Sequence, residues 1–219
     1  MKTIELNASV TASNDADADA IRMEMKAKGT LLVNLMSSPG SGKTTLLSRI
    51  IKDLKGEKKI GVMEADIASD VDAIRVEEAG ARSIQAHTDG MCHMDAGMTR
   101  RAMEAMGTEE LDLVFLENVG NLICPAEFDT GAGKNIMILS VPEGDDKPLK
   151  YPLMFEKSDA LVITKMDTKD YFDFDLAKCI ERVKRLNENI EIFPVSAKTG
   201  EGIDELEAWL SEQVSQWKA

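Results

Sequence analysis

A glycine-rich loop between two apolar segments constrains this chain more than any other feature. Residues 37–45 read Ser-Ser-Pro-Gly-Ser-Gly-Lys-Thr-Thr, after the apolar run Leu31–Met36 and before a segment with helical periodicity at Thr45–Ile51. A strand, a glycine-rich turn and a helix in this order are typical of a phosphate-binding P-loop. Its backbone N–H groups face phosphate oxygens at the positive end of the helix. The chain is therefore predicted to bind a nucleoside triphosphate.

Several positions in this loop have distinct expected roles. Gly40 and Gly42 permit the tight bend, Lys43 is expected to reach the β- and γ-phosphates, and the Thr44 hydroxyl is expected to bind Mg²⁺. Ser37 stands where the usual pattern begins with glycine, and serine can replace it if its φ is negative. A plain glycine turn would explain the glycines but not the Lys-Thr pair. The predicted phosphate-binding residues are Gly40, Ser41, Gly42, Lys43, Thr44 and Thr45.

Length, charge and cysteine content limit the class of protein. A chain of 219 residues fits one domain with a full core, or at most two small ones. The net charge of −13 argues against nucleic acid as the main partner. No apolar run approaches the length of a membrane span, and no signal-peptide core is evident. Three scattered cysteines do not form a disulfide framework, so a reducing, cytoplasmic location is expected.

Strand-like and helix-like segments alternate after the P-loop, which predicts a parallel sheet covered on both faces. The fold class is therefore a three-layer α/β P-loop NTPase with a mostly parallel central sheet and helices on both faces. Strands are predicted at 59–64, 83–86, 111–116, 135–141, 160–164 and 190–195, and helices at 71–79, 95–106, 174–187 and 203–217.

The first 28 residues are predicted to form an N-terminal arm and a short helix, separate from a P-loop GTPase domain at 29–219. Residues 1–16 lack an apolar period, so we expect a loose arm with a short extended piece at Ile4–Leu6. A helix is predicted around Asp19–Lys28, with Ile21 and Met25 on one face and Gly29 as its stop.

Polar residues after the strands are further candidates, because ligands of such folds bind at the carboxyl ends of the strands. An acidic side chain at Glu117 can hold Mg²⁺ through water, and the Gly120 N–H can bond the γ-phosphate. Asp66 and Asp72 could bind Mg²⁺ or orient the attacking water. Each carboxylate could instead be a solvated loop residue or a helix cap. The predicted catalytic residues are Lys43, Thr44, Asp66, Asp72, Glu117 and Gly120.

Two later loops predict which base is bound. Thr-Lys-Met-Asp at 164–167 and Ser-Ala-Lys at 196–198 each follow a predicted strand, and they resemble the Asn-Lys-x-Asp and Ser-Ala-Lys motifs of GTPases. Asp167 can accept two hydrogen bonds from guanine, a pattern that adenine does not offer. Thr164 departs from the asparagine of the motif but leaves this carboxylate in place. The predicted base-contacting residues are Lys165, Asp167, Ser196, Ala197 and Lys198, with GTP favoured over ATP.

Nucleotide binding does not explain Cys92, His93 and Cys124. Their spacing is not that of a zinc finger, although thiolate and imidazole together suit Zn²⁺ or Ni²⁺. Two partly buried thiols and a loop histidine are the alternative. Cys179 lies on the apolar face of the predicted helix 174–187, so we interpret it as a core residue.

From about Leu31 to the C-terminus the motifs resemble those of the HypB family of hydrogenase nickel-incorporation GTPases. The pieces that match are the P-loop, Glu-x-Asp at 64–66 with Asp72 beyond it, Cys-His-Met-Asp at 92–95, Glu-Asn-Val-Gly-Asn-Leu-Ile-Cys-Pro-Ala at 117–126 and Glu-Gly-Asp-Asp at 143–146. The string at 117–126 is long and specific, and it favours this family over the related urease-accessory GTPases.

The resemblance implies a SIMIBI-class GTPase that binds GTP or GDP with Mg²⁺ and delivers nickel to the [NiFe]-hydrogenase large subunit, together with a HypA-type nickel-binding partner. It also implies a nucleotide- and metal-dependent homodimer with a Ni²⁺ or Zn²⁺ site at its interface, where Cys92, His93 and Cys124 of both protomers are ligands. Lys150 matches a family lysine expected to reach the partner's nucleotide. The family's His-rich or Cys-containing N-terminal motif is missing, so no nickel storage is expected.

Cys124 follows Gly120 by four residues, so we expect GTP to assemble the metal site and hydrolysis to change it. Turnover should be slow because no built-in arginine finger is evident; Arg75 better suits a helix-surface ion pair. Two other classes stay open: a small-molecule kinase, which would prefer ATP, and a nucleotide-gated interaction module whose cysteines bind structural zinc.

Overall fold

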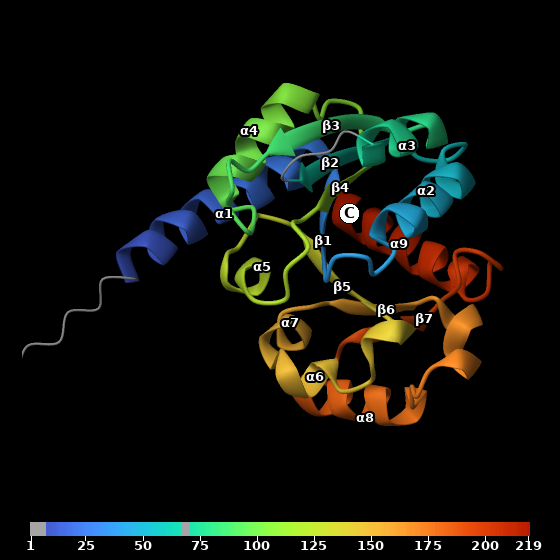
Figure 1. The fold of residues 1–219 in the computed structure, drawn as a ribbon. Helices are drawn as coiled ribbons and strands as arrows, with labels where there is room; N and C mark the ends of the chain where they lie inside the picture. The colour runs from blue at the N-terminus through green and yellow to red at the C-terminus, as the bar shows by residue number, and fades with distance from the viewer. Residues whose placement is uncertain (1–7, 67–70) are drawn as a thin grey trace, which may run out of the picture.

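The computed structural model describes the backbone of residues 8–66 and 71–219 and, apart from residues 8–11, 66 and 71–73, their side chains. Its strands form one seven-stranded sheet in the order β3-β2-β4-β1-β5-β6-β7, and every pairing within these ranges is parallel (Figure 1). The strands are β1 Leu31–Ser37, β2 Ile60–Asp66, β3 Arg82–His87, β4 Leu113–Glu117, β5 Lys134–Ser140, β6 Ala160–Thr164 and β7 Glu191–Pro194. The predicted α/β class with a parallel central sheet is confirmed.

Helices cover both faces of the sheet (Figure 1). One face packs against α2, α3 and α9, and the other packs against α1 and α4 and, further along the sheet, α7 and α8. None of the described helices is both long and apolar enough to span a membrane. The helices are α1 Ala8–Lys28, α2 Lys43–Leu54, α3 Val71–Ala79, α4 Ala96–Met106, α5 Cys124–Glu127, α6 Lys147–Lys150, α7 Pro152–Glu156, α8 Leu176–Leu186 and α9 Ile203–Lys218, with 3₁₀ turns η1 Val141–Glu143 and η2 Met166–Tyr171.

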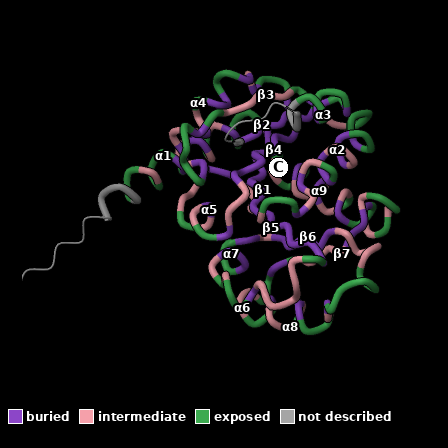
Figure 2. Tube along the Cα trace, in the orientation of Figure 1, coloured by how far each residue is buried: buried purple, intermediate pink, exposed green. Residues whose placement is uncertain are grey.

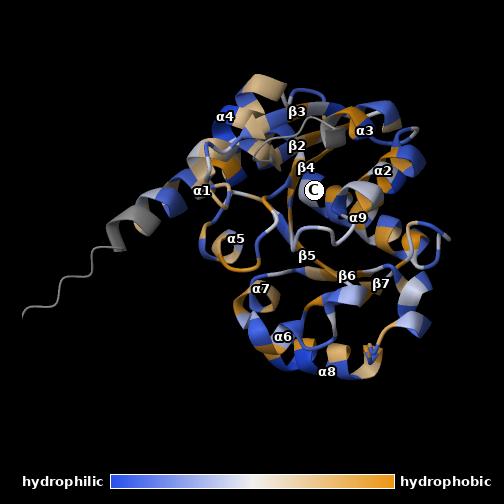
Figure 3. Ribbon diagram, viewed as in Figure 1, coloured by the Kyte–Doolittle hydropathy of each residue, from blue (hydrophilic) through white to orange (hydrophobic). Residues whose placement is uncertain are grey.

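The strands are apolar almost throughout because both faces of the sheet are covered. In β1 successive side chains alternate between the layers: Leu31 and Val33 join the cluster under α2 and α9, whereas Leu32 joins the cluster under α1 and α4. The central strands are buried along their length (Figure 2), and apolar residues dominate them (Figure 3). Because β1, β4 and β2 are parallel neighbours, their carboxyl ends lie at the same edge of the sheet, where the predicted polar residues follow them.

Each predicted strand after the P-loop occurs within two residues of the predicted bounds, and the long helices agree similarly. The short helices α5, α6 and α7 were not predicted. These segments have only four or five residues each, too few for a helical period to appear, and Pro125, Pro148 and Pro152 occupy their first turns.

The N-terminal segment differs from its prediction. Residues 8–16 belong to α1, a helix of 21 residues, whereas we expected a loose arm up to residue 16. The expected stop at Gly29 is confirmed, since Gly29 N–H donates to Lys26 O and Thr30 N–H donates to Met25 O. Ile21 and Met25 are fully buried against the sheet. The extended piece expected at 4–6 lies outside the described residues.

Candidate functional site

The P-loop connects β1 to α2 at the carboxyl edge of the sheet. Gly42 precedes α2 with φ 94°, a left-handed conformation that favours glycine, and Gly40 has φ 74°. Ser37 ends β1 with extended backbone and is not among the described non-glycine residues with positive φ. Serine is thus tolerated at this position, as the sequence analysis required.

Lys43 and Thr44, the first residues of α2, both face Glu117 at the end of β4. Lys43 Nζ donates to Ser37 Oγ over 2.9 Å and lies 3.9 Å from Glu117 Oε1. The Thr44 hydroxyl donates to the same Glu117 oxygen over 3.3 Å. Lys43 and Glu117 are both buried, so their charges interact with little screening by water. The geometry places one cation and two oxygen ligands beside the P-loop.

These residues line a cavity of about 520 Å³, within the usual size of small-molecule sites. Gly120 and Val119 border it from the segment after β4. Sequence reasoning did not assign Glu64 or Arg75 to this site. Glu64 is buried at the end of β2 and pairs in register with Glu117, and Arg75 of α3 also lines the cavity. Glu64 could have been found as a charged residue that ends an apolar strand.

The segment that was predicted to read the base is tied directly to the P-loop. The Thr164 hydroxyl donates to Ser41 O over 2.6 Å, and Lys165 Nζ donates to Gly40 O over 2.7 Å. Lys165 itself has φ 60°, which turns the chain sharply after β6. The threonine that departs from the GTPase motif therefore anchors its loop to the phosphate-binding loop.

The two predicted base-reading loops lie side by side. Ser196 Oγ donates to Asp167 Oδ1 over 2.8 Å, and Lys198 Nζ lies 3.9 Å from Asp167 Oδ2. Met166 N–H donates to Val195 O, which fixes the backbone of one loop against the other. Ala197 follows Ser196 in the same loop and is half-buried. Asp167 therefore lies where the two motifs meet.

Cys92, His93 and Cys124 come together although 31 residues separate His93 from Cys124 in the chain. One ligand atom from each lies within 4.8 Å of the others. Cys92 Sγ donates to Cys124 Sγ over 2.9 Å, and Cys92 Sγ lies 3.8 Å from His93 Nδ1. His93 is buried, and its ring stacks on Phe128 with centroids 3.9 Å apart. Two thiols and an imidazole at this spacing suit Ni²⁺ or Zn²⁺.

The protonation of this cluster follows from its surroundings. Burial lowers the pKa of His93, although Asp95 and Glu127 oppose the shift, so the imidazole is neutral and able to bind a metal near pH 7. The hydrogen bond with Cys92, together with burial, raises the pKa of Cys124. A metal ion must therefore displace a proton from Cys124 on binding.

A buried amide connects the cavity to this cluster. Asn118 directly follows Glu117, is fully buried, and accepts through Oδ1 from Met94 N–H over 3.0 Å. The same oxygen accepts from Val119 N–H over 2.9 Å, while Nδ2 donates to Asn34 Oδ1 over 3.0 Å. Met94 is the chain neighbour of His93. Asn118 thus joins the two predicted sites. It was not predicted from the sequence, because an asparagine by itself does not indicate which distant groups its amide will bond.

Four further residues of the sequence analysis either lie apart from these contacts or have side chains outside the described residues. Lys150 does not line the cavity and forms an ion pair with Asp146 in α6. The side chains of Asp66 and Asp72 lie outside the described residues, although the backbone places Asp66 at the end of β2 and Asp72 in α3. Cys179 is fully buried on α8 and takes no part in the cysteine–histidine cluster.

Comparison with known proteins gives one family and close relatives. Residues 31–194 match the nucleotide-binding domain described as CobW/HypB/UreG. The chain is 44% identical over 209 residues to a hydrogenase maturation factor HypB of Rhizobium leguminosarum bv. viciae, covering 95% of this chain and 70% of that protein.

Two solved structures share the fold. HypB from Helicobacter pylori in complex with nickel has a TM-score of 0.87 and 38% identity, covering 93% of this chain and 96% of that one. HypB from Archaeoglobus fulgidus has the same TM-score and 35% identity, with 93% and 99% covered. The similarity therefore extends over almost the whole of both chains.

Proposed function

This chain belongs to the HypB family of hydrogenase maturation factors, and from that membership we propose that it is a GTP-hydrolysing metallochaperone which delivers nickel during [NiFe]-hydrogenase maturation. The observation that carries the proposal is the connection between two sites. Asn118 lines the cavity beside the P-loop, and its side chain accepts a hydrogen bond from the backbone N–H of Met94, which directly follows Cys92 and His93 of the Cys92–His93–Cys124 cluster. In this proposal GTP, Mg²⁺ and Ni²⁺ or Zn²⁺ are the ligands, and the protein works in the cytoplasm.

The P-loop side of the cavity suits phosphoryl chemistry. Backbone N–H groups of the P-loop and the positive end of α2 bind the phosphates. Lys43 exchanges its contact with Ser37 for the β- and γ-phosphates, and Gly120 N–H senses the γ-phosphate. Thr44 and Glu117 offer the hard oxygen ligands that suit Mg²⁺, which would neutralise developing charge on the phosphates.

Guanine selection is assigned to Asp167, whose carboxylate lies between the two base-reading loops. Lys165 lies along the base, and Ala197 N–H meets the guanine oxygen. This assignment follows the matched motif positions, and Ser196 supports it because its hydroxyl orients Asp167. Adenine would leave the carboxylate without its two donors, which disfavours the kinase alternative.

In this proposal the metal ion is the cargo, and Cys92, His93 and Cys124 hold it. One chain supplies three ligands, and tetrahedral sites take four. The cluster opens to the surface at Cys92 and is flanked by the exposed apolar side chains of Met91 and Ile123. A second copy of the chain, bound in the GTP state, would complete the coordination and cover these side chains, with Lys150 reaching the partner's nucleotide. A HypA-type protein and the hydrogenase large subunit are the proposed partners.

Nucleotide state is proposed to change the metal site by two routes. Cys124 follows the γ-phosphate loop in the chain, and Asn118 links that loop to the Met94 backbone beside His93. A loop held by the γ-phosphate and released after hydrolysis would therefore move ligands on both sides of the cluster. Coupling of this kind must be reciprocal, so bound metal must shift GTP affinity by the same factor.

Titration of the protein with Ni²⁺ and Zn²⁺, without nucleotide, with GDP and with a non-hydrolysable GTP analogue, tests the proposal. Metal affinity should differ between the GDP and GTP-analogue states, and Cys124→Ala should abolish the difference along with tight binding. Cys179→Ala is the matched control, because this thiol is buried away from the cluster. Equal affinity in every nucleotide state would remove the coupling, and no metal binding at all would remove the cargo role.

Hydrolysis is tested separately by phosphate release. Lys43→Ala and Thr44→Ala should abolish turnover while circular dichroism shows an intact fold. Full activity in either variant would overturn the phosphate-site assignment.

A further inference from the structure

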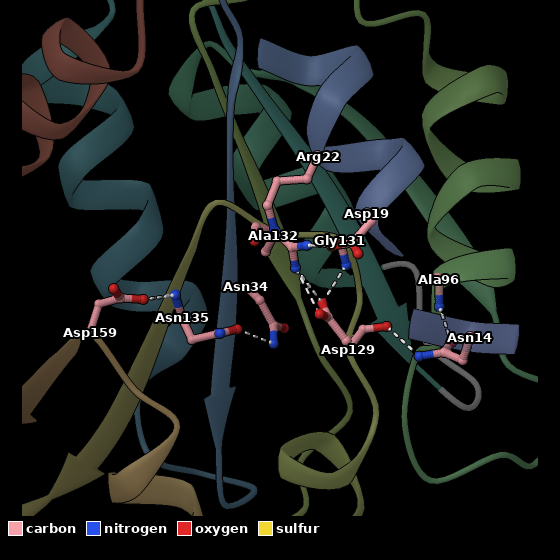
Figure 4. Close-up of polar contacts among 10 residues, drawn as sticks. All are labelled: Asn14, Asp19, Arg22, Asn34, Ala96, Asp129, Gly131, Ala132, Asn135 and Asp159. Carbon is pink, nitrogen blue, oxygen red and sulfur yellow. Dashed lines mark hydrogen bonds and ion pairs between the residues drawn. The ribbon is translucent and has the colours of Figure 1, made fainter. Parts of the chain in front are cut away.

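The two segments that carry the metal ligands are joined by one side chain from α1. Asn14 Oδ1 accepts from Ala96 N–H, at the start of α4, over 2.9 Å. Asn14 Nδ2 donates to Asp129 O over 2.9 Å. Figure 4 shows this amide between the two backbone groups. Ala96 is three residues beyond His93, and Asp129 is five residues beyond Cys124.

The Asp129 end of this bridge is itself fixed to α1. The Asp129 carboxylate accepts from Arg22 Nη2 over 2.9 Å and 2.7 Å and also from Gly131 N–H over 2.8 Å. Arg22 Nε donates to Ala132 O over 3.2 Å. One guanidinium nitrogen of Arg22 thus contacts both carboxylate oxygens of Asp129, while Nε donates to Ala132 O, so the side chain ties two points of this loop to α1 (Figure 4).

The helix also lies directly against this loop. Gly131 has φ 79°, and a Cβ on it would lie 2.7 Å from Ile21 Cβ and 2.9 Å from Ala18 O. Only glycine permits both this backbone conformation and this approach. The part of α1 that contains Ala18, Ile21 and Arg22 is therefore packed directly against residues 129–132.

Between the two anchor points the ligand-bearing segments meet through His93 and Phe128. Phe128 adjoins Asp129 and stacks on His93, at an interplanar angle of 14°. The Cys92–His93 segment and the Cys124 segment are thus connected by the stacked ring pair and by the Asn14 amide, and also by a hydrogen bond from Asn121 Nδ2 to Cys92 O over 3.4 Å. Groups that hydrogen-bond directly to metal ligands usually affect metal affinity by about 10- to 100-fold, and Asn14 acts one step further out, through the backbone of both segments.

We propose that Asn14 is a positioning residue of the metal site, holding the Cys92–His93 segment and the Cys124 segment at the separation that metal binding requires. The N-terminal helix is thereby part of the metal site's scaffold without providing a ligand. This inference rests on the proposed function, since it assumes that the cysteine–histidine cluster binds the metal.

The test is Asn14→Ala, compared with the parent and with Asn187→Ala as the matched control. Asn187 bridges backbone groups in the same manner but far from the cluster: Nδ2 donates to Ser158 O over 2.9 Å, and Oδ1 accepts from Asn189 N–H over 3.1 Å. Each protein is titrated with Ni²⁺ and with Co²⁺, and thiolate-to-metal charge-transfer absorption is recorded. Circular dichroism and GDP binding report on the fold.

Asn14→Ala is expected to weaken metal affinity by about 10-fold, the lower end of the range for direct partners of metal ligands, and to change the charge-transfer spectrum, with GDP binding unchanged. Asn187→Ala is expected to retain the parent affinity and spectrum. Parent-like metal binding and spectrum in Asn14→Ala would overturn the inference, as would an equal loss in Asn187→Ala, because the effect would then be one of general stability. Failure of the parent itself to bind metal would instead overturn the proposed function.

Discussion

Metal binding to the cysteine–histidine cluster should release two protons per ion in the nucleotide-free protein. Cys92 Sγ donates a hydrogen bond to Cys124 Sγ, and the raised pKa of Cys124 keeps this second thiol protonated at pH 7. Burial lowers the pKa of His93, so the imidazole binds as the neutral base and loses none. Both thiols must become thiolates in the complex.

The magnitude follows from this count. Each displaced proton changes the dissociation constant by about 10-fold per pH unit, or about 1.4 kcal/mol. Two protons therefore give about 100-fold per pH unit, or about 2.7 kcal/mol. Affinity should rise as pH increases and should level off only once pH exceeds the raised pKa of Cys124. Below the lowered pKa of His93 the imidazole must also lose a proton, so the slope should steepen there.

Competition titrations with a chelator of known affinity, between about pH 6.5 and about pH 8, measure the slope, and proton release in weakly buffered solution measures the count directly. Cys124→Ser should halve the slope. Cys179→Ala should leave it unchanged, because burial raises the pKa of this distant thiol to about 12 and it lies apart from the cluster. A slope of one proton or fewer in the parent would refute the reasoning, since one of the two thiols would then not be a protonated ligand.

Three further perturbations test other parts of the structure. Asp167→Asn should weaken GTP by about 1–3 kcal/mol and favour xanthine nucleotides in competition assays, because the amide replaces one acceptor by a donor; unchanged GTP binding would exclude this loop as the base reader. Gly120→Ala should weaken a GTP analogue more than GDP, because its Cβ would lie 2.9 Å from Pro39 Cγ and 3.0 Å from Pro39 N and would displace the N–H that we propose contacts the γ-phosphate. Overpacking of this kind costs about 1–3 kcal/mol, and equal effects on both nucleotides would contradict the prediction. Burial and the neighbouring Asp53 raise the pKa of Glu207 to about 7. The folded protein is more stable with this carboxyl protonated, so stability is lost as pH rises towards that value, and Glu207→Gln should raise the melting temperature at about pH 8 but not at about pH 4.5. A higher melting temperature at both pH values would point to a cause other than charge.

Much of the fold could be predicted because its signals are local. A short apolar run such as Leu113–Leu116 is typical of a central strand that is buried on both faces, and the P-loop glycines mark the turn that follows β1. The parallel arrangement then follows from strands that alternate with helices. The motif at 164–167, to which we assign base recognition, could equally be found from the sequence, because its residue types and spacing match those of a known motif.

The N-terminal helix shows where local signals fail. Residues 12–16 read Ala-Ser-Asn-Asp-Ala, a composition typical of a loose arm, yet they are helical. Asn14 and Arg22 bond to residues 96, 129 and 132, which are distant in the chain, and these contacts outweigh the weak helix propensity of Ser, Asn and Asp. No window of the sequence contains that information.

The sequence by itself therefore determined the strands, the phosphate loop and the residue types available for chemistry, because each depends on neighbours within one turn or one strand. Tertiary structure decided which of those residues act together. It brought Cys124 to Cys92, placed Glu64 and Arg75 on the cavity beside the P-loop, and set Asn118 between that cavity and the cysteine–histidine cluster. The physical reason is that these pairings join segments tens of residues apart, whose separation is fixed only when the sheet and both helical layers have packed.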